Sequence, residues 1–428
     1  MKITETAKAL FTEGALKQLA YIYVADEAGA KKQAERYENA VAEFIKLYGS
    51  DREVEFFSAP GRTEVGGNHT DHQQGRVLAG SVNLDVIAVC SKNSDNIIRI
   101  KSEGYRMDEI DLGDLGVQQN EINKAASLIR GTAARFRELG YEVGGFDAYT
   151  TSNVLKGSGL SSSAAFEVLV GTMLSHAYNS GKISAIEIAQ IGQYAENFYF
   201  GKPCGLMDQM ASSVGGFVAI DFLNPAHPVV EKIEYDFGAS GYTLCILDTG
   251  GNHADLTSDY AAVPEEMKRI AAYFGKNVLR EVDTAEFYDK LPELRKTAGD
   301  RAVLRAIHFF ADSEKAKKEA EALREGDFNK FKKLIIASGE SSFACLQNVF
   351  STQNVEEQGL SLALALTKKM LSTRGAWRVH GGGFAGTRQV FVPNDMLADY
   401  KFYREKVFGY GNCHVLSIRP VGGIKVEL

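Results

Sequence analysis

The sequence predicts an α+β protein, and three observations carry that prediction. Segments typical of strands and of helices are mixed along the chain without strict alternation, which favours α+β over a doubly wound sheet. The 428 residues are enough for one large or two medium domains at about 100–200 residues each. No internal repeat is visible, which argues against a solenoid or a propeller. We place a domain boundary near residue 225, so that the predicted domains are residues 1–225 and 226–428.

The first half of the chain begins with two predicted helices, because residues 12–23 and 34–49 repeat apolar residues at three- and four-residue spacing. Residues 54–62 then form a predicted strand that ends at a Pro-Gly turn. Two segments rich in β-branched residues predict further strands over 79–93 and 96–104. An amphipathic helix, a strand, two helices and a strand are expected next, over 121–139, 145–154, 164–179, 184–201 and 215–222.

The second half is expected to add a smaller number of strands to a longer helical region. Residues 242–250 predict a strand, and the charged segment 259–333 is mostly helical in pattern. Residues 376–393 combine a Gly-rich turn with a strand, and residues 424–428 predict the last strand.

Composition excludes several classes of function. Hydrophobic residues make up 45% of the chain and charged residues 24%, as in ordinary globular enzymes, and the net charge of −7 disfavours a nucleic-acid or anionic-membrane binder. No stretch approaches the roughly 18–20 apolar residues of a membrane span, and the N-terminus lacks a signal-peptide pattern. The 5 cysteines are scattered without CxxC spacing, which predicts a cytoplasmic protein without a zinc site. No segment indicates an obligate protein partner.

The stretch "KGSGLSSSAA", residues 156–165, places small side chains just before a long apolar run. Glycine lets a backbone approach a ligand closely, and a helix N-terminus offers unpaired N–H groups with a partial positive charge. Together these features predict an anion site, most simply for phosphate. The alternative is a plain Gly/Ser loop that caps a core helix. This stretch fits neither the Walker A pattern nor GxGxxG, since "GSGLSS" lacks the third glycine, so a nucleotide here would be bound by another family's geometry.

Two further stretches, "APGRTEVGGNHTDHQQG" (59–75) and "VHGGGFAGT" (379–387), join the serine loop in a recognisable set. The three resemble the three motifs of the GHMP small-molecule kinases, and the first is close to the galactokinase signature. The segments 195–212, 258–260 and 303–341 are also similar to galactokinases, so the resemblance runs in order from about residue 55 to the C-terminus.

The resemblance implies a two-domain GHMP kinase fold. Its N-terminal domain is a mixed sheet with helices like that of ribosomal protein S5, its C-terminal domain is ferredoxin-like, and the active site lies in the cleft between them. The implied reaction is ATP plus α-D-galactose to ADP plus galactose 1-phosphate, with Mg²⁺. Galacturonate or N-acetylgalactosamine is an alternative sugar. A non-catalytic sugar and ATP sensor is a second alternative, against which the intact serine loop, Arg62 and Asp208 argue.

The resemblance also assigns roles to single residues. Asp208 becomes the base beside the anomeric hydroxyl and Arg62 its partner that offsets phosphoryl charge, although alone they read as a capping aspartate and a surface ion pair. Glu196 and Ser163 become Mg²⁺ ligands, where Glu196 alone reads as a solvated helix carboxylate. The expected sugar contacts are Asn68, His69, Asp71, Gly205 and Tyr260. The expected nucleotide contacts are Gly157, Ser158, Gly159, Leu160, Ser161, Ser162, Ser163 and Ala164.

Three features of the polar motif leave questions open. His69, Asp71 and His72 are close enough in sequence to suggest a metal site, but consecutive loop residues seldom converge without further ligands. Galactokinases usually carry Glu at the position of Asn68, Tyr at that of His72, and an apolar run with Asn in place of "TEVGG". Asn68 falls where the family's Glu meets the C6 side of the sugar, so the group at C6 stays open.

In the Gly-rich loop, Gly382 and Gly383 are expected to tolerate a side chain least.

Overall fold

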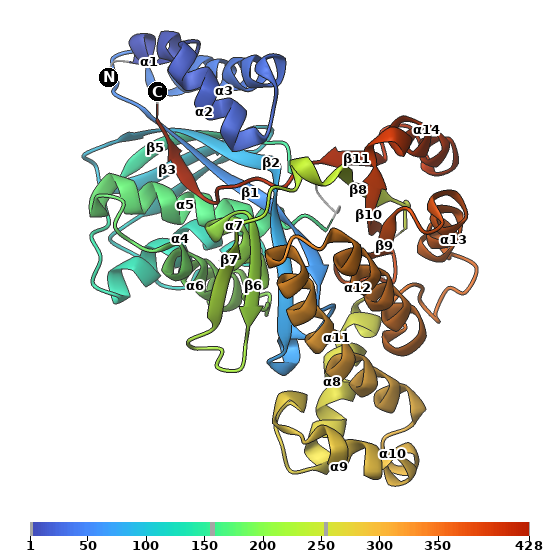
Figure 1. Cartoon of the computed structure of the whole chain (residues 1–428). Coiled ribbons are helices and arrows are strands. Elements are labelled where there is room, and N and C mark those ends of the chain that lie inside the picture. Colours follow the sequence, from blue (N-terminus) through green and yellow to red (C-terminus); the bar gives the residue numbers. More distant parts are fainter. Residues whose placement is uncertain (1–2, 155–158, 252–255, 428) are drawn as a thin grey trace.

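The computed structural model describes residues 3–154, 159–251 and 256–427. Two β-sheets and the helices around them make up the molecule (Figure 1). Within the described residues, no helix combines the length and the apolar character that a membrane crossing needs. The predicted α+β class with two sheets is therefore confirmed.

The larger sheet has 8 strands, with the order β12-β1-β2-β5-β3-β4 and with β6 and β7 attached at β2. The two halves of the long strand β2 pair with different strands. Its C-terminal half pairs with β5, and its N-terminal half pairs with β6. The pair β3–β5 is parallel and the other pairs are antiparallel. The strands are β1 (Glu55–Gly66), β2 (Arg76–Lys92), β3 (Ile97–Ser102), β4 (Met107–Asp111), β5 (Phe146–Ser152), β6 (Phe217–Asp221), β7 (Val229–Ile233) and β12 (Ile424–Val426).

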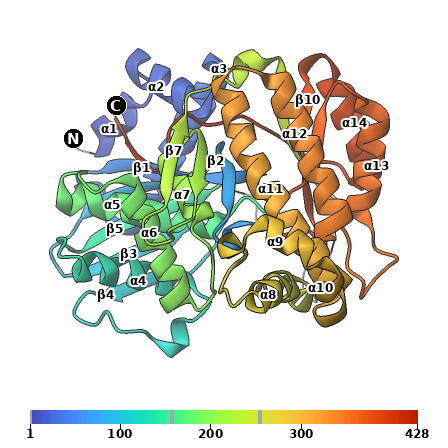
Figure 2. The ribbon, with the colours of Figure 1, turned by 60° about the horizontal axis from the view of Figure 1, so that its bottom comes forward.

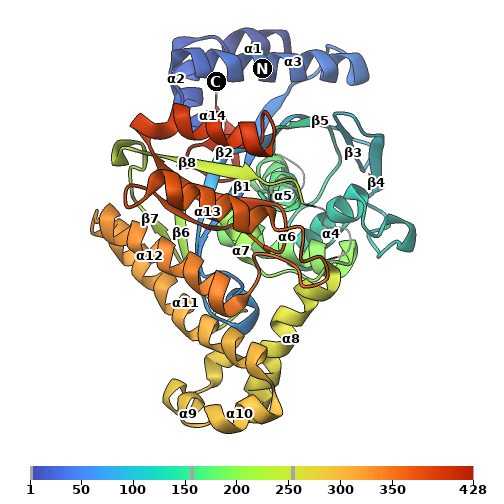
Figure 3. The same ribbon diagram turned by 90° about the vertical axis from the view of Figure 1, so that its right-hand side faces the viewer.

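Helices cover both faces of this sheet (Figures 1 and 3). Successive side chains of a strand point to opposite faces, and Phe56 accordingly packs with the N-terminal helices while Phe57 packs in the main core on the other side. One face carries α1 (Ile3–Ala9), α2 (Glu13–Tyr23) and α3 (Glu27–Tyr48). The other carries α4 (Ala125–Glu138), α5 (Ser162–Asn179), α6 (Ala185–Ala195) and α7 (Met207–Val214).

The smaller sheet has 4 antiparallel strands in the order β11-β8-β10-β9. Phe391 on β10 faces the main core and α12, whereas Val390 faces α13 and α14. The core that begins under the larger sheet therefore continues to the inner face of the smaller one. The elements are β8 (Tyr242–Asp248), β9 (Ala376–Val379), β10 (Thr387–Pro393), β11 (Cys413–Leu416), α12 (Phe328–Ser341), α13 (Gly359–Leu371) and α14 (Leu397–Phe408).

A helical lobe with its own apolar cluster projects from the second half (Figure 2). It consists of α8 (Thr257–Tyr273), α9 (Thr284–Asp289), α10 (Leu291–Thr297) and the long α11 (Asp300–Arg324). Helix α11 also packs against β1 and β2, so the lobe is tied to the larger sheet.

The predicted elements are found in the predicted order, with differences at their ends. Strand β1 runs on to Gly66 through the Pro-Gly turn, and the helix expected over 184–201 closes with a π-helical turn at Glu196–Phe200. Strands β4, β7, β9 and β11 and helices α1, α13 and α14 were not predicted. Of the strands, β4 ("MDEID") is mostly polar and β7 ("VVEKI") is mostly exposed at an edge of the sheet. Strand β7, which follows residue 225, pairs with β6, and β12 near the C-terminus pairs with β1. The larger sheet therefore contains residues from both sides of position 225, and the boundary there stays a prediction.

Candidate active site

Arg62 and Asp208, which are 146 residues apart in sequence, meet in a bidentate ion pair. Arg62 Nε and Nη2 each donate to a carboxylate oxygen of Asp208 at 2.7 Å. The β1–β2 register shifts between Pro60 and Arg62, and such bulges commonly redirect side chains beside functional sites. The side chain of Arg62 is 8% exposed and that of Asp208 31%, so the carboxylate keeps an open side.

Electrostatics keep both members of this pair charged. Burial disfavours the ionised form of Asp208, but the charge and hydrogen bonds of Arg62 outweigh it, so the pKa of Asp208 lies below its ordinary value. Burial also disfavours the guanidinium of Arg62, yet the nearby carboxylates, led by Asp208, raise the pKa of Arg62. An ionised carboxylate with an open side can accept a proton from a bound hydroxyl group.

The serine loop lies against the same pair. Ser161 is the N-cap residue of α5, in the left-handed region at φ 55°, and its hydroxyl donates to Asp208 instead of capping the helix. The carbonyl of Gly159 accepts from Arg62 Nη1, and the carbonyl of Leu160 accepts from the backbone N–H of Arg62 at 3.0 Å. The side chain of the N-cap residue Ser161 makes no capping bond to α5, so among the described residues the first N–H groups of the helix can serve an anion.

The remaining predicted nucleotide contacts divide into two groups. Ser162, Ser163 and Ala164 form the first turn of α5 behind this anion site. Gly157 and Ser158 lie outside the described residues.

Glu196 and Ser163, the predicted metal ligands, are brought together. Ser163 Oγ donates to Glu196 Oε1 at 3.2 Å, and Lys202 Nζ lies 3.2 Å from the same oxygen. One carboxylate and one hydroxyl are hard oxygen donors that fit Mg²⁺, which usually keeps waters and binds substrate phosphates as well. Lys202 supplies a positive charge at this oxygen. No group of three or more His, Cys, Asp or Glu residues suited to a metal is found in the described part of the chain.

Gln209 was not predicted, although its side chain joins Glu196 to a second buried carboxylate, that of Glu167. Its Nε2 donates to Glu196 Oε2 at 2.7 Å and to Glu167 Oε2 at 2.9 Å, and it follows Asp208 directly in α7. Lys202 was not predicted either. Its place in "FGKPCGLMDQ", between the two predicted acidic residues, was the only sequence signal for it.

Asp71 and Gly205, two predicted sugar contacts, touch each other. A Cβ atom on Gly205 would lie 2.2 Å from Asp71 Oδ2, so only glycine leaves room for this carboxylate. The side chain of Asp71 is 13% exposed at the start of a short 3₁₀ turn, Asp71–Gln73. His72 Nε2 lies 3.7 Å from Asp71 Oδ1. Among the described residues, these two side chains are not part of a group of three or more that could hold a metal ion.

His69 and Tyr260 bind the Gly-rich loop that follows β9. His69 Nε2 donates to the carbonyl of Gly382 at 2.9 Å, and the hydroxyl of Tyr260 donates to the carbonyl of Gly383 at 3.0 Å. Burial, followed by the nearby His72, lowers the pKa of His69 to about 4, so this imidazole is neutral at pH 7.

The loop glycines are as constrained as predicted. A Cβ atom on Gly382 would lie 2.6 Å from Tyr260 Cε1, and one on Gly383 would lie 2.1 Å from the carbonyl oxygen of Asn348. Gly383 also has a φ of +78°, which disfavours other residues.

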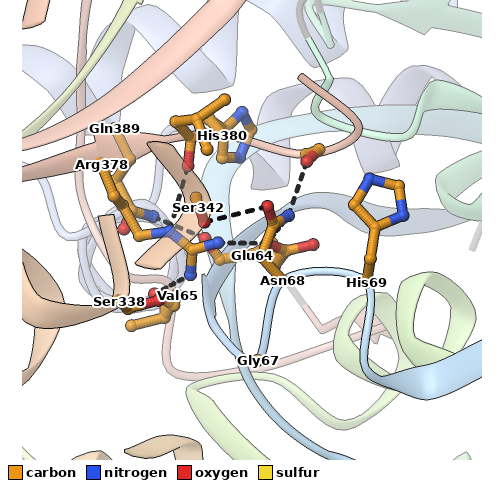
Figure 4. Close-up of polar contacts among 12 residues, drawn as sticks. Glu64, Val65, Gly67, Asn68, His69, Ser338, Ser342, Arg378, His380 and Gln389 are labelled. Carbon is orange, nitrogen blue, oxygen red and sulfur yellow. Dashed lines mark hydrogen bonds and ion pairs between the residues drawn. The ribbon is translucent and has the colours of Figure 1, made fainter. Parts of the chain in front are cut away.

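Asn68, another predicted sugar contact, is buried within a network of polar side chains (Figure 4). The residue is 0% exposed, and its carboxamide is hydrogen-bonded to Glu64, Gly381 and Asn348. Direct contact with a sugar would require at least one of these bonds to break, so the structure does not support the expected contact at C6.

Comparisons with known proteins agree with this geometry. Residues 127–216 match the family described as GHMP kinases N terminal domain, and residues 42–92 match the galactokinase galactose-binding signature. A galactokinase from Actinobacillus pleuropneumoniae is 30% identical over 84% of this chain and 90% of its own length. A galactokinase from Streptomyces coelicolor is 29% identical over 82% of this chain and 87% of its own.

A solved structure leads to the same family. The structure of Lactococcus lactis galactokinase complexed with galactose matches with a TM-score of 0.75 and 25% identity, covering 90% of this chain and 98% of that one. The GHMP kinase fold and the prediction of an ATP-dependent kinase are confirmed. The chain belongs to the galactokinase family.

Proposed function

We propose that this protein transfers the γ-phosphoryl group of ATP to the anomeric hydroxyl of α-D-galactose, giving ADP and galactose 1-phosphate. The observation that carries the proposal is the bidentate Arg62–Asp208 pair, held at the uncapped N-terminus of α5. This arrangement sets a proton acceptor next to an anion site, which is what phosphoryl transfer to an alcohol requires.

In the proposed reaction, Asp208 accepts the proton of the anomeric hydroxyl through its open side. The sugar oxygen bonds to the γ-phosphorus, and the bond from that phosphorus to the β–γ bridging oxygen breaks to release ADP. Arg62 keeps Asp208 ionised and offsets charge on the transferring group. The N–H groups at the start of α5 and the hydroxyls of Ser162 and Ser163 would hold the phosphates.

Ser163 and Glu196 would hold Mg²⁺, which neutralises phosphate charge when bound. Lys202 Nζ lies 3.2 Å from Glu196 Oε1, the same oxygen that accepts from Ser163, and would add positive charge beside the metal and the phosphates.

Sugar recognition is assigned to the groups that surround Asp71. Its carboxylate suits a pair of neighbouring hydroxyls, such as O3 and O4 of galactose, and Gly205 gives it room. His69 and Tyr260 would act through the Gly-rich loop, whose carbonyls at Gly382 and Gly383 accept their hydrogen bonds. We also propose a cytoplasmic location, because all five cysteines are free thiols.

The test is a coupled ADP-release assay with galactose, glucose, galacturonate and N-acetylgalactosamine. Galactose should give the highest kcat/KM, and glucose, which inverts O4, should be poorer by up to about 10⁴–10⁵-fold. Equal rates with glucose and galactose would contradict the role of Asp71. ATP binding without ADP release for any sugar would instead favour a sensor.

A further inference from the structure

A polar network behind the candidate site joins β1 of the larger sheet to β9 and the Gly-rich loop (Figure 4). Its centre is the side chain of Asn68, which is fully buried. Nothing in the proposed reaction uses this side chain, and its hydrogen bonds are nevertheless complete.

Both ends of the Asn68 carboxamide are occupied. Its Nδ2 donates to Glu64 Oε1 and to the carbonyl of Gly381, each at 2.8 Å. Its Oδ1 accepts from Asn348 Nδ2 at 2.8 Å and from Ser342 Oγ at 3.3 Å. An amide has two donors and two acceptor positions, so this one is saturated by the protein.

The neighbour of Asn68 explains why the side chain must be neutral. Glu64 Oε1 also accepts from Arg378 Nη2 at 2.6 Å, and the two side chains are 6% and 0% exposed. The Asn68 side chain thus already faces one buried carboxylate, which is paired with a guanidinium, and a second buried carboxylate, that of Asp312, accepts from the Asn68 backbone N–H at 2.9 Å. A carboxylate at position 68 would face Glu64 and the carbonyl of Gly381 without a donor between them.

The loop that Asn68 holds is the one that His69 and Tyr260 contact. Asn348 Nδ2 donates both to Asn68 Oδ1 and, at 3.1 Å, to the carbonyl of Gly382. That carbonyl also accepts from His69. The orientation of the Asn68 amide therefore fixes the Gly381–Gly382 turn from two sides.

We propose that Asn68 is a positioning residue that sets the Gly-rich loop against His69 and Tyr260, and that Glu64 restricts this position to a neutral amide. The inference rests on the proposed function for its consequence in catalysis. Asn68 would then influence sugar binding through His69 and the loop carbonyls, without touching the sugar.

The experiment compares Asn68→Asp with a double variant and a matched control. Asp keeps the shape of Asn but removes both donors. The double variant Glu64→Gln/Asn68→Asp moves the carboxylate from position 64 to position 68 and so removes the pair of facing carboxylates, but it cannot restore the bond to Gly381. The control is Asn93→Asp, because Asn93 Nδ2 also donates to a carboxylate and a carbonyl, of Asp147 and Ile97, each at 3.0 Å and outside the site.

The first readout is amide hydrogen exchange over residues 381–387, measured with the thermal midpoint of each protein and without substrates. The N–H of Phe384 donates to the carbonyl of Asn348, so loosening of the loop should expose it. We expect exchange there to be about tenfold faster in Asn68→Asp, as for the loss of one buried hydrogen bond. The double variant should regain thermal stability but not loop protection, and Asn93→Asp should lose stability alone.

The second readout is kinetic. The KM for galactose should rise about tenfold in Asn68→Asp while the KM for ATP stays unchanged, since the side-chain partners of Asn68 among the described residues include neither Arg62 nor the serine loop. If Asn68→Asp does not fold, Asn68→Ala removes the amide without adding charge and should show the same loop exchange.

Three results would overturn the proposal. One is a rate of amide hydrogen exchange over residues 381–387 that is the same in Asn68→Asp or Asn68→Ala as in the control Asn93→Asp, at equal thermal stability. Another is full recovery of loop protection in the double variant, which would deny the bond to Gly381 its role. A third is no recovery of stability in the double variant, which would remove the restriction by Glu64. If the wild-type protein phosphorylates no sugar, the proposed function fails, but the exchange data still decide the positioning role.

Discussion

Glu319 offers a direct test of the packing between α11 and β1. Its carboxyl group is 0% exposed, and neither of its oxygens has a hydrogen-bond partner among the described residues. Burial first, and then the charge of Asp312, raises the pKa of Glu319 from 4.5 to about 8. We predict that Glu319→Gln will change how the free energy of unfolding depends on pH.

The sign of the effect follows from the raised pKa. The folded state prefers protonated Glu319, so its contribution to stability is complete below pH 4.5 and is lost as the pH rises through 8. At about 1.4 kcal/mol per pH unit, the loss across this interval is on the order of 5 kcal/mol. Glutamine cannot ionise, but its buried amide lacks partners and should cost about 1–3 kcal/mol at every pH.

The variant should therefore be less stable than the wild type at pH 5 and more stable at pH 9. Thermal unfolding at a fixed heating rate from pH 5 to 9 would measure the difference. With an unfolding entropy of about 2.1 cal/mol/K per residue over 428 residues, 5 kcal/mol corresponds to about 5 °C. Glu321→Gln, in the same helix but half-exposed, is the control and should follow the wild type. Parallel curves for wild type and Glu319→Gln would refute the reasoning.

Three further predictions concern the site and its support. Asp208→Asn should keep ATP binding and lose about 10²–10⁴-fold in turnover in the ADP-release assay, and activity within a few-fold of wild type would remove Asp208 from the mechanism. Glu196→Gln should raise the half-saturating Mg²⁺ concentration with little change in the KM for galactose, and an unchanged Mg²⁺ titration would make Glu196 a bystander. Gly66→Ala should lower the thermal midpoint, because its Cβ would lie 1.6 Å from Glu319 Oε2. Adding Glu319→Ala should restore most of that loss, and a single variant as stable as wild type would contradict the contact.

Local patterns predicted most of the fold because the two faces of β1 and β2 are both buried. Strand β2 contains the apolar run Val86–Cys90, which is typical of a strand covered on both sides, and helices α2 and α3 carry clear helical spacing. The path of the last strand could not be predicted, because pairing of β12 with β1 joins residues more than 360 positions apart. The polar edge strand β4 lacked the alternation that marks a half-buried strand.

The site was predicted through motifs, and the motifs do not report hydrogen-bond partners. The meeting of Arg62 with Asp208 and of Ser163 with Glu196 agrees with the pairs expected from the family resemblance. Asn68 differs, because its exposure depends on Asn348 and Gly381, which are about 300 residues away in sequence and lie in two different loops. A motif position alone cannot show whether its side chain faces a ligand or the protein interior.

Strand β1 links the reaction site to the joint between the sheets, and this follows from where its side chains go. Arg62 pairs with Asp208 on α7, Glu64 pairs with Arg378 on β9, and Gly66 admits the carboxyl group of Glu319 on α11. These three positions are every second residue of the strand, and they contact elements from both halves of the chain. A change at the α11 contact therefore has a short, continuous covalent route to the guanidinium that holds Asp208. Because buried pairs of this kind tolerate little displacement, the residues that join the two sheets also set the geometry in which phosphate and sugar would meet.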